Sequence, residues 1–259
     1  MNKILLTGHR GFIGKHLLTK LKKNYAVVGI DLKDGWDRDN LNNSQDLLTC
    51  DLKEDFDTII HLAGKSGVRE SINDPNGYWQ NNVEVSKRLF ERYPDARILY
   101  ASSSSAYEPH LNPYAASKLI VEEAAACYPN TLGMRFHTVY SDTPRENMFL
   151  AKLFNGKLEY VTNHYRDFIH IEDLCTAILL LLKSNYTDVI DIGTGHPFRI
   201  RDFAPDLPIR LNTPNERSWT CANTEKLKFL GFKPKYSIEK YLTNMNQDNI
   251  IDITLGEPT

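Results

Sequence analysis

The sequence predicts an α/β protein, a doubly wound parallel sheet with a small C-terminal subdomain, and three observations support this. A glycine-rich turn joins an apolar run to a helix-like segment at the start of the chain. Apolar runs of strand length then alternate with helical segments, the pattern that places helices on both faces of a parallel sheet. From about residue 197 the pattern becomes Pro-interrupted and mixed, which favours an appended subdomain over more sheet.

The expected strands and helices begin with a strand–turn–helix unit. Lys3 to Thr7 is a short apolar run that predicts a buried strand, and the segment from Phe12 to Leu21 has helical spacing. A second β-rich run, 25–30, precedes a polar stretch at 34–46 that is typical of an exposed loop. Further runs of strand length lie at 57–64, 97–101, 131–136 and 189–192. Helices are expected at 78–93, from residue 113 or 114 to 127, and at 174–182.

Composition and charge disfavour several classes of function. The chain has 259 residues, enough for one large α/β domain with a smaller annex. Its formal net charge is −2, so we expect no nucleic-acid partner. Neither a signal peptide nor an apolar stretch of about 18 residues is evident, so we expect a cytoplasmic protein with no membrane partner. Its 4 cysteines are scattered without zinc-ligand spacing, which predicts reduced thiols and no metal site.

Glycines at positions 8, 11 and 14 form the turn between the first strand and the first helix. Such glycines permit a tight turn, let the backbone approach a pyrophosphate and allow close packing of helix on strand, which predicts a dinucleotide-binding Rossmann unit. Asp31 ends the second strand, where a carboxylate can bind the 2′-hydroxyl of the adenosine ribose and would repel a 2′-phosphate. We therefore expect NAD as the cofactor, although Arg10 could reach the 2′-phosphate of NADP.

Tyr114 and Lys118 lie four positions apart at the start of a predicted helix, so their side chains share one face. A tyrosine hydroxyl is a poor base at neutral pH, but a nearby ammonium and a bound nicotinamide ring favour its phenolate. Such a pair could take a proton from a sugar hydroxyl during hydride transfer, although the spacing alone is more often that of a solvated pair. Serines at 102–105 follow a predicted strand, at the end where open α/β sheets bind ligands. The order of all these motifs favours the catalytic interpretation.

Jointly, these motifs resemble the extended short-chain dehydrogenase/reductase family. Within it the sequence is similar to the nucleotide-sugar 4-epimerases, particularly the UDP-glucuronate 4-epimerase type. The resemblance covers most of the chain and is carried by TGHRGFIG (7–14), the acidic residue at 31, CDL (50–52), HLAGKSGVRESINDPNGYWQNNV (61–83), YASSSSAY (100–107), PYAASK (113–118), LGMRFHTVY (132–140), RDFIHIEDL (166–174) and IDIGTGHPFRIRDF (190–203).

The resemblance implies a role for each matching residue. Ser103 matches the active-site serine, Tyr114 the proton acceptor and donor, and Lys118 its electrostatic partner and a ligand of the nicotinamide ribose. Besides Tyr114 and Lys118, the implied cofactor-binding residues are Gly8, Arg10, Gly11, Phe12, Ile13, Gly14, Asp31, Asp51, Leu52, Leu62, Ala63, Gly64 and Asn82. Epimerases of this type oxidise the sugar at C4, let the ketose turn over and return the hydride to its other face.

The resemblance also implies domains and partners. Residues 1–140, completed by about 164–195, would form the NAD-binding Rossmann domain, and 141–163 with 196–259 a small substrate-binding subdomain. Candidates to bind the diphosphate or a uronate carboxylate of a nucleotide-sugar substrate are Arg145, Arg166 and Arg217, although each could be a surface cation. The resemblance also implies a homodimer formed through the helices at 78–93 and 114–127, as is usual in the family.

The chain departs from the family pattern at its active-site loop. Tyr114 follows Ser103 by only 11 positions, where the family usually has about two dozen. Positions 103–105 are serines where the related 4,6-dehydratases carry Thr-Asp-Glu, so a dehydratase is disfavoured. The leading hypothesis is an NAD-dependent 4-epimerase of a UDP-sugar, of the UDP-glucuronate or UDP-glucose type. The alternatives are a nucleotide-sugar reductase or decarboxylase of the same family, and a catalytically silent NAD-binding protein.

Overall fold

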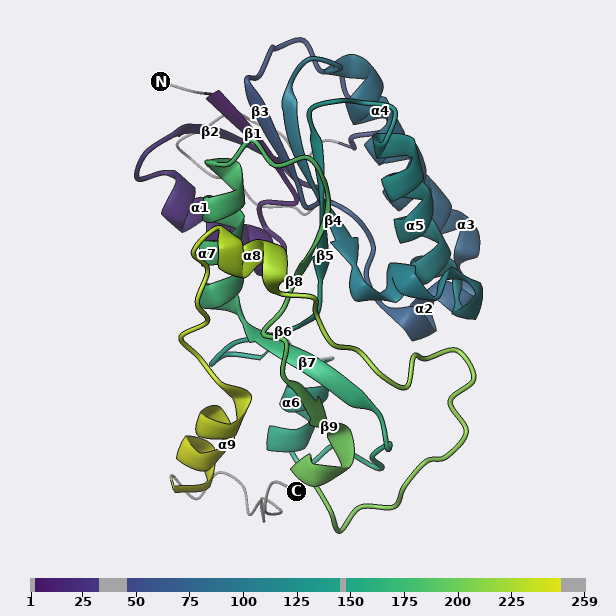
Figure 1. Ribbon diagram of the computed structural model, residues 1–259. Coiled ribbons are helices and arrows are strands. Elements are labelled where there is room, and N and C mark those ends of the chain that lie inside the picture. Colours follow the sequence, from purple (N-terminus) through teal and green to yellow (C-terminus); the bar gives the residue numbers. More distant parts are fainter. Residues whose placement is uncertain (1–2, 33–45, 145–147, 248–259) are drawn as a thin grey trace. The chain divides into compact units, whose positions relative to one another are not determined.

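The computed structural model describes residues 3–32, 46–144 and 148–247 of the chain (Figure 1). The chain divides into two compact units: unit 1 is Met1–Arg135 with Leu179–Ile190, and unit 2 is Phe136–Ile178 with Asp191–Thr259. The helix α7 (Ile171–Leu182) contributes residues to both units. Among the described residues, no helix is long and apolar enough to cross a membrane. Except for Asp46, the polar stretch expected as a loop at 34–46 lies outside the described residues.

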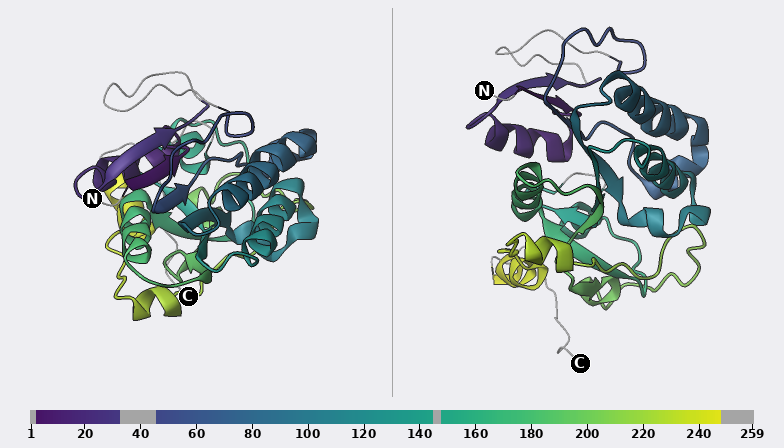
Figure 2. Two further views of the ribbon diagram at one scale, coloured as in Figure 1. Left: turned by 90° about the horizontal axis from the view of Figure 1, so that it is seen from above. Right: turned by 45° about the horizontal axis from the view of Figure 1, so that its top comes forward.

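Unit 1 contains a six-stranded sheet. Its strands are, in spatial order, β2 (Ala26–Ile30), β1 (Lys3–Thr7), β3 (Thr58–His61), β4 (Arg97–Ser103), β5 (Thr131–Phe136) and β8 (Asp188–Ile192). The strand β1 pairs in parallel with β2 and β3, and β3 pairs in parallel with β4. The helix α1 (Phe12–Leu21) covers one face, and α4 (Val85–Arg92) and α5 (Pro113–Ala125) cover the other (Figures 1 and 2). This is the predicted doubly wound arrangement.

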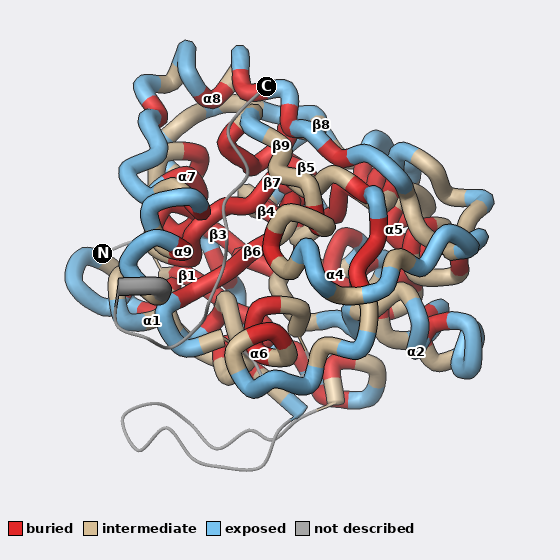
Figure 3. The backbone as a smooth tube through the Cα atoms, turned by 90° about the horizontal axis from the view of Figure 1, so that it is seen from below, coloured by how far each residue is buried: buried red, intermediate tan, exposed pale blue. Residues whose placement is uncertain are grey.

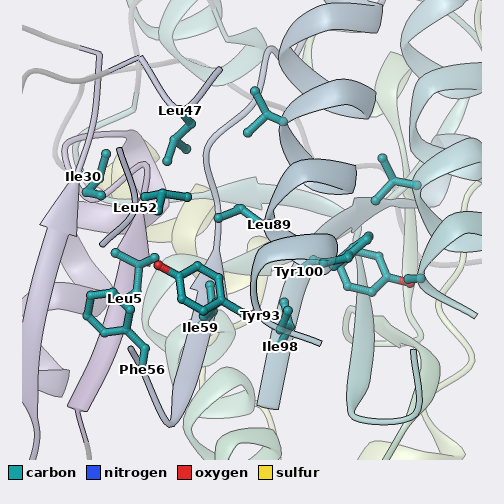
Figure 4. Close-up of a cluster of buried hydrophobic side chains, with 14 of the residues drawn as sticks. Leu5, Ile30, Leu47, Leu52, Phe56, Ile59, Leu89, Tyr93, Ile98 and Tyr100 are labelled. Carbon is teal, nitrogen blue, oxygen red and sulfur yellow. The ribbon is translucent and has the colours of Figure 1, made fainter. Parts of the chain in front are cut away.

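One apolar cluster of unit 1 lies between the sheet and the helices α4 and α5. Every residue of β3 is buried, as expected for a parallel strand covered on both faces, and β1 and β4 are largely buried (Figure 3). Leu5, Ile59 and Ile98 come from three neighbouring strands, and Leu89 of α4 packs in the same cluster (Figure 4). Burial of this apolar surface holds both helices on the sheet.

The helix expected over 78–93 is confirmed as one continuous helical stretch with a π-helical middle: α3 (Pro75–Tyr78), the π-helix η1 (Trp79–Glu84) and α4. A short helix that the sequence did not predict, α2 (Val68–Asn73), precedes it. The side chain of Asp74 caps α3, and Pro75 at the first helical position fits that cap. Between β4 and α5, residues Ser104–Tyr107 and Pro109–Leu111 form the 3₁₀-helices η2 and η3. Asn112 then caps α5 by accepting the Ala115 N–H.

Unit 2 contains a second, three-stranded sheet. Its strands β6 (Thr138–Tyr140), β7 (Tyr165–His170) and β9 (Pro197–Arg199) lie in that order, with β6 parallel and β9 antiparallel to β7. The helical elements are α6 (Phe149–Phe154), the 3₁₀-helix η4 (Ile200–Phe203), α8 (Glu225–Phe229) and α9 (Ile238–Gln247). The expectation of no further sheet after residue 197 was wrong for β9, because a three-residue strand is too short to show a period in the sequence.

Candidate functional site

The glycine turn of unit 1 needs glycine at two positions for steric reasons. Gly8 has φ +71°, in the left-handed region, and a Cβ there would lie 2.6 Å from the backbone nitrogen of Ala63. A Cβ on Gly14 would lie 2.1 Å from the Gly8 carbonyl oxygen. The Gly8 N–H donates to the Ile30 carbonyl oxygen at 2.8 Å, which ties the turn to the end of β2. Tight packing of strand, turn and helix therefore excludes side chains here.

The start of α1 fits the pyrophosphate of a dinucleotide. Gly11 precedes the helix, no side chain caps it, and its first turn contains no acidic residue. Among the described residues outside its own helix and chain neighbours, a Cβ on Gly11 would meet one atom within 4 Å, the Gly8 carbonyl oxygen at 3.1 Å. The N–H groups of the first turn, which begins at Phe12 and Ile13, lie at the positive end of the helix dipole. Such a helix start suits a phosphate.

Asp31 directly follows β2 and contacts the same turn. Its Oδ2 accepts a hydrogen bond from the Arg10 backbone N–H at 2.9 Å. The carboxylate that the sequence predicts as a ribose ligand therefore lies beside the turn predicted to hold the phosphates. The implied adenine-contacting residues differ in exposure: Leu52 is buried in the core cluster, whereas Asp51 is exposed and lies 3.1 Å from the Lys53 ammonium.

The residues after β3 pack against the end of β1. Leu62 and Ala63 donate their backbone N–H groups to the carbonyl and the hydroxyl oxygen of Thr7, each at 3.2 Å. A Cβ on Gly64 would lie 2.9 Å from the Asn82 Oδ1 and 3.8 Å from the Lys118 Nζ. This stretch, predicted to line the cofactor, is therefore in direct proximity to the candidate catalytic lysine.

Ser103, Tyr114 and Lys118 come together where β4 ends and α5 begins. The strand extends to Ser103, two residues beyond the expected end, and the Ser103 side chain is hydrogen-bonded to that of Tyr114. Lys118 is 8% exposed; its Nζ donates to the Ala101 carbonyl oxygen at 2.7 Å and lies 5.9 Å from the centroid of the Tyr114 ring. The three residues predicted as catalytic are therefore neighbours within unit 1.

Burial shifts the pKa values of this cluster. Burial raises the pKa of Tyr114 above its ordinary value, and the hydrogen bond with Ser103 opposes that rise. Burial lowers the pKa of Lys118 to about 8, and the carboxylate of Glu122, one turn further along α5, opposes that fall. Lys118 is therefore mostly charged at neutral pH, and a positive charge near a phenol favours the phenolate that a base requires.

A buried ion pair behind the serines was missed by sequence reasoning. Glu122 is 6% exposed and accepts a hydrogen bond from the Ser102 hydroxyl. Its two carboxylate oxygens also accept from Arg135, from Nε at 2.8 Å and from Nη2 at 2.5 Å. Such a bidentate pair holds α5 against β4 and β5. The available signal was the spacing of Lys118 and Glu122, which places a carboxylate four positions after the predicted catalytic lysine.

A buried chain of hydrogen bonds joins the end of β1 to α5. The Ser86 hydroxyl donates to the Asn82 carbonyl oxygen at 2.6 Å, so it accepts in its contact with the His61 Nε2 at 3.0 Å. The His61 Nδ1 consequently accepts from the Thr7 hydroxyl at 2.7 Å. Burial lowers the pKa of His61 to about 3, which is consistent with this neutral ring. At the other end, the Asn82 Nδ2 donates to the Ser117 hydroxyl at 2.9 Å.

Asn82 lies in the π-helix η1, a rare element that is frequent at functional sites. Besides its bond to Ser117, the Asn82 side chain accepts the Lys65 N–H at 2.8 Å and donates to the Lys65 carbonyl oxygen at 3.1 Å. Asn82 therefore connects the loop after β3 with α5, which agrees with a supporting position beside the predicted cofactor residues.

The arginines predicted to bind substrate fall in unit 2, except that Arg145 lies outside the described residues. Arg166 is half-buried; its Nη2 lies 3.1 Å from the His164 Nδ1 and 4.0 Å from the Glu216 Oε2. Arg217 is also half-buried. Arg166 is thus held by residues of its own unit.

Asp167, which follows Arg166, is completely buried in unit 2. Its Oδ1 accepts from the backbone N–H and the hydroxyl of Thr194 at 2.8 and 2.7 Å. Its Oδ2 accepts from the N–H groups of Gly195 and Ala222 at 2.8 and 2.9 Å. Four donors match the acceptor capacity of a carboxylate, so Asp167 links three chain segments as a structural group.

Two histidines of unit 2, His137 and His170, are buried. The His170 Nδ1 accepts the Glu172 N–H at 3.3 Å. Neither ring nitrogen of His137 has a hydrogen-bond partner among the described residues, but its Nε2 lies 3.8 Å from the Asp191 Oδ2. In the same residues, no cluster of three or more His, Cys, Asp or Glu side chains could hold a metal ion.

Known proteins resemble this chain over nearly its whole length. The sequence profile of the NAD dependent epimerase/dehydratase family matches residues 4–193. A UDP-glucuronate 4-epimerase of Thermodesulfobacterium geofontis (strain OPF15) is 27% identical, over 96% of this chain and 98% of the relative. The solved structure of UDP-glucuronic acid 4-epimerase from Bacillus cereus, in complex with UDP-glucuronic acid and NAD, is 27% identical with a TM-score of 0.82, covering 96% of this chain and 98% of the other.

A second solved structure, MoeE5 in complex with UDP-glucose and NAD, is 26% identical with a TM-score of 0.83, covering 96% of this chain and all of the other. These matches confirm the predicted Rossmann-type α/β fold and the resemblance to nucleotide-sugar 4-epimerases. The description of the matching family includes NAD, which confirms the cofactor predicted from the glycine turn and Asp31.

Proposed function

Because this chain belongs to the NAD dependent epimerase/dehydratase family, we propose that it is a 4-epimerase of a UDP-sugar, of the UDP-glucuronate or UDP-glucose type. The observation that carries the proposal is the cluster of Ser103, Tyr114 and Lys118, with the Ser103–Tyr114 hydrogen bond and the buried ammonium one turn along α5. The UDP-sugars bound by two structural relatives support the substrate class.

The proposed chemistry is a reversible oxidation at C4 of the sugar. The phenolate of Tyr114 takes the proton of the C4 hydroxyl and later returns it, so the same oxygen acts as base and as acid. The Ser103 hydroxyl orients the reacting oxygen, and the Lys118 ammonium stabilises the phenolate. NAD, when bound, supplies the hydride acceptor for C4 and the donor for the return step. The intermediate ketose must rotate in the site between the two steps, so that the hydride returns to its other face and the configuration at C4 changes.

The residues proposed to hold NAD are all in unit 1. The backbone of Gly8, Gly11 and Gly14 and the first turn of α1 hold the pyrophosphate, and Asp31 binds the adenosine ribose. Leu62, Ala63 and Gly64 line the cofactor, and Lys118 also binds the nicotinamide ribose. The remaining members of this proposed set are Arg10, Phe12, Ile13, Asp51, Leu52 and Asn82.

The proposed substrate-binding residues are the arginines Arg145, Arg166 and Arg217. Guanidinium groups suit a diphosphate or a uronate carboxylate because both accept bidentate hydrogen bonds. The proposed domain assignment follows: residues 1–140 with about 164–195 bind NAD, and 141–163 with 196–259 bind the sugar nucleotide. The serines at 103–105 remain the reason to favour epimerisation over water elimination.

The proposed assembly is a homodimer formed by the helices around 78–93 and 114–127. Trp79, at the start of this region, is 47% exposed, and Ile72 on the preceding helix is 42% exposed. Apolar side chains of this size suit burial in an interface. Light scattering of the purified protein should give twice the chain mass of 29.7 kDa. A mass of one chain at micromolar concentration would contradict the dimer.

The experiment for the proposed activity begins with the bound nucleotide. The purified protein is denatured, and the released nucleotide is identified and quantified; about one NAD per chain is expected for a cofactor that is regenerated in each cycle. Intact protein is then incubated with UDP-glucuronate, UDP-glucose and UDP-N-acetylglucosamine, and products are separated by anion-exchange chromatography. The expected product is the C4 epimer of one of these sugars, without net formation of NADH.

Each other outcome of this experiment would assign a different function to the protein. Net consumption of NADH as a sugar nucleotide is reduced, or loss of CO₂ from UDP-glucuronate, would replace the proposal with the reductase or decarboxylase of the same family. NAD-loaded protein that converts no UDP-sugar would contradict the epimerase and favour a silent NAD-binding protein.

A further inference from the structure

His9 contacts Arg10 at the glycine turn; Arg10 is a member of the proposed NAD-binding set, whereas the proposed function gives His9 no role. His9 directly follows Gly8 and is 5% exposed. Its ring packs on Gly29 of β2, because a Cβ added at that glycine would lie 2.7 Å from the His9 Cγ. The His9 ring therefore lies against Gly29, which is two positions before Asp31, the residue proposed to bind the ribose.

Both the backbone and the side chain of Arg10 donate hydrogen bonds to nearby residues. Its backbone N–H donates to the Asp31 Oδ2 at 2.9 Å, and its Nε donates to the His9 Nε2 at 3.2 Å. Because a guanidinium can only donate, the His9 Nε2 must be the acceptor, and the neutral ring carries its proton on Nδ1. The His9 Nδ1 is itself buried without a hydrogen-bond partner among the described residues. Burying this nitrogen without a partner costs free energy of folding, and the packing of the ring on Gly29 does not by itself explain why a histidine occupies this position.

We propose that His9 is a positioning residue for cofactor choice: it holds the Arg10 guanidinium against the imidazole, so that Arg10 does not bind the 2′-phosphate of NADP. The Arg10 backbone lies one hydrogen bond from Asp31, so its side chain is within reach of any ribose substituent that this carboxylate contacts. A guanidinium is also the preferred partner of a phosphate. Two devices then disfavour NADP, the charge of Asp31 and the His9–Arg10 bond.

This inference rests on the proposed cofactor site but not on the sugar reaction, so binding tests it. The wild-type protein and the variants His9→Ala, His9→Gln and His9→Ala/Arg10→Ala are freed of bound nucleotide and titrated with NAD and with NADP by calorimetry. In His9→Ala, the ratio of the NADP Kd to the NAD Kd should fall about tenfold, the size expected for releasing one hydrogen bond of a charged group. His9→Gln retains an acceptor and should keep the wild-type ratio.

The double variant separates positioning from a change in packing. Without the guanidinium, removal of His9 should leave the ratio of the two dissociation constants at its wild-type value. A ratio that is unchanged in His9→Ala, or a fall that persists in His9→Ala/Arg10→Ala, would overturn the inference. Wild-type protein that binds neither nucleotide would overturn the proposed cofactor site together with it. An inactive protein that binds NAD and follows the expected ratios would overturn only the epimerase.

Discussion

Unit 1 and unit 2 both bury ionisable side chains, but the surroundings of these side chains differ between the two units. In unit 1, Lys118 is buried with a pKa lowered to about 8, beside a tyrosine whose pKa is raised by burial. In unit 2, the carboxylate of Asp167 is fully buried, and four hydrogen-bond donors occupy its oxygens. A group whose protonation is shifted by its surroundings can do proton chemistry, whereas a saturated carboxylate holds chain segments together.

Residues that surround these buried groups also differ in role between the two units. In unit 1, the chain from Thr7 through His61 and Asn82 to Ser117 links the strand that ends in the glycine turn to the helix that carries Tyr114. This chain supports a reactive cluster without taking part in it. Asp173 of unit 2, in contrast, accepts the N–H groups of Lys235 and Tyr236, both at 2.9 Å, and so fastens a distant loop to α7. Variants in the two units should therefore change different measured quantities.

The largest expected effect is on turnover in unit 1. Tyr114→Phe removes the proposed acid and base while keeping the ring, so kcat should fall about 10³-fold, within the range for general acid–base catalysis. The NAD released on denaturation should stay near one per chain. Tyr25 is a half-buried tyrosine directly before β2, and Tyr25→Phe is the matched control that should leave kcat unchanged. Turnover of Tyr114→Phe within twofold of wild type would remove Tyr114 from the mechanism.

In unit 2 the largest expected effect is on stability. Asp167→Ala leaves four donors, three of them buried, without their acceptor, so the free energy of unfolding should fall by about 3 kcal/mol. Urea denaturation followed by circular dichroism measures this change. Asp206→Ala removes an exposed carboxylate of the same unit and should change stability by less than about 0.5 kcal/mol. Equal stabilities of the two variants would show that Asp167 is not the structural group inferred here.

The sequence indicated more of unit 1 than of unit 2, because the geometric requirements of the glycine turn and of the Tyr114–Lys118 pair are local. Gly8 and Gly14 satisfy steric needs within one turn, and the Tyr114–Lys118 spacing places two side chains on one helix face whatever the rest of the chain does. The hydrogen-bond partners of Asp167 lie 27 to 55 positions away in the sequence, so no local sequence pattern predicts them. The pair of Glu122 with Arg135 depends likewise on how α5 packs beside β5. Strands of three residues in unit 2 are too short for a visible period.

The pH dependence of Lys118 should separate activity from stability. The charged lysine supports the phenolate, so kcat should fall, by about tenfold per pH unit, as pH rises through about 8. Stability should change in the opposite direction. Between about pH 8 and the ordinary value of 10.5, the unfolded chain binds the proton more tightly than the folded one, so this group's contribution to stability rises with pH.

The measurements are kcat and the free energy of unfolding from pH 6.5 to 9.5, for wild type and for Lys118→Met. The variant lacks the titrating group, so the stability difference between the two proteins should depend on pH above about 8. A kcat that still rises at pH 9, together with a stability difference independent of pH, would show that Lys118 does not titrate in this range.

The smallest expected effect concerns substrate affinity in unit 2. Arg217→Ala removes a half-buried guanidinium proposed to bind the diphosphate or a uronate carboxylate, so KM for the sugar nucleotide should rise about fivefold. Because the arginine is not part of the proposed proton-transfer cluster, kcat and the NAD content should not change. Lys233→Ala, at an exposed position of the same unit, controls for the loss of a positive charge. A fall in kcat or in bound NAD with unchanged KM would place Arg217 with the cofactor machinery and end the division of roles between the two units.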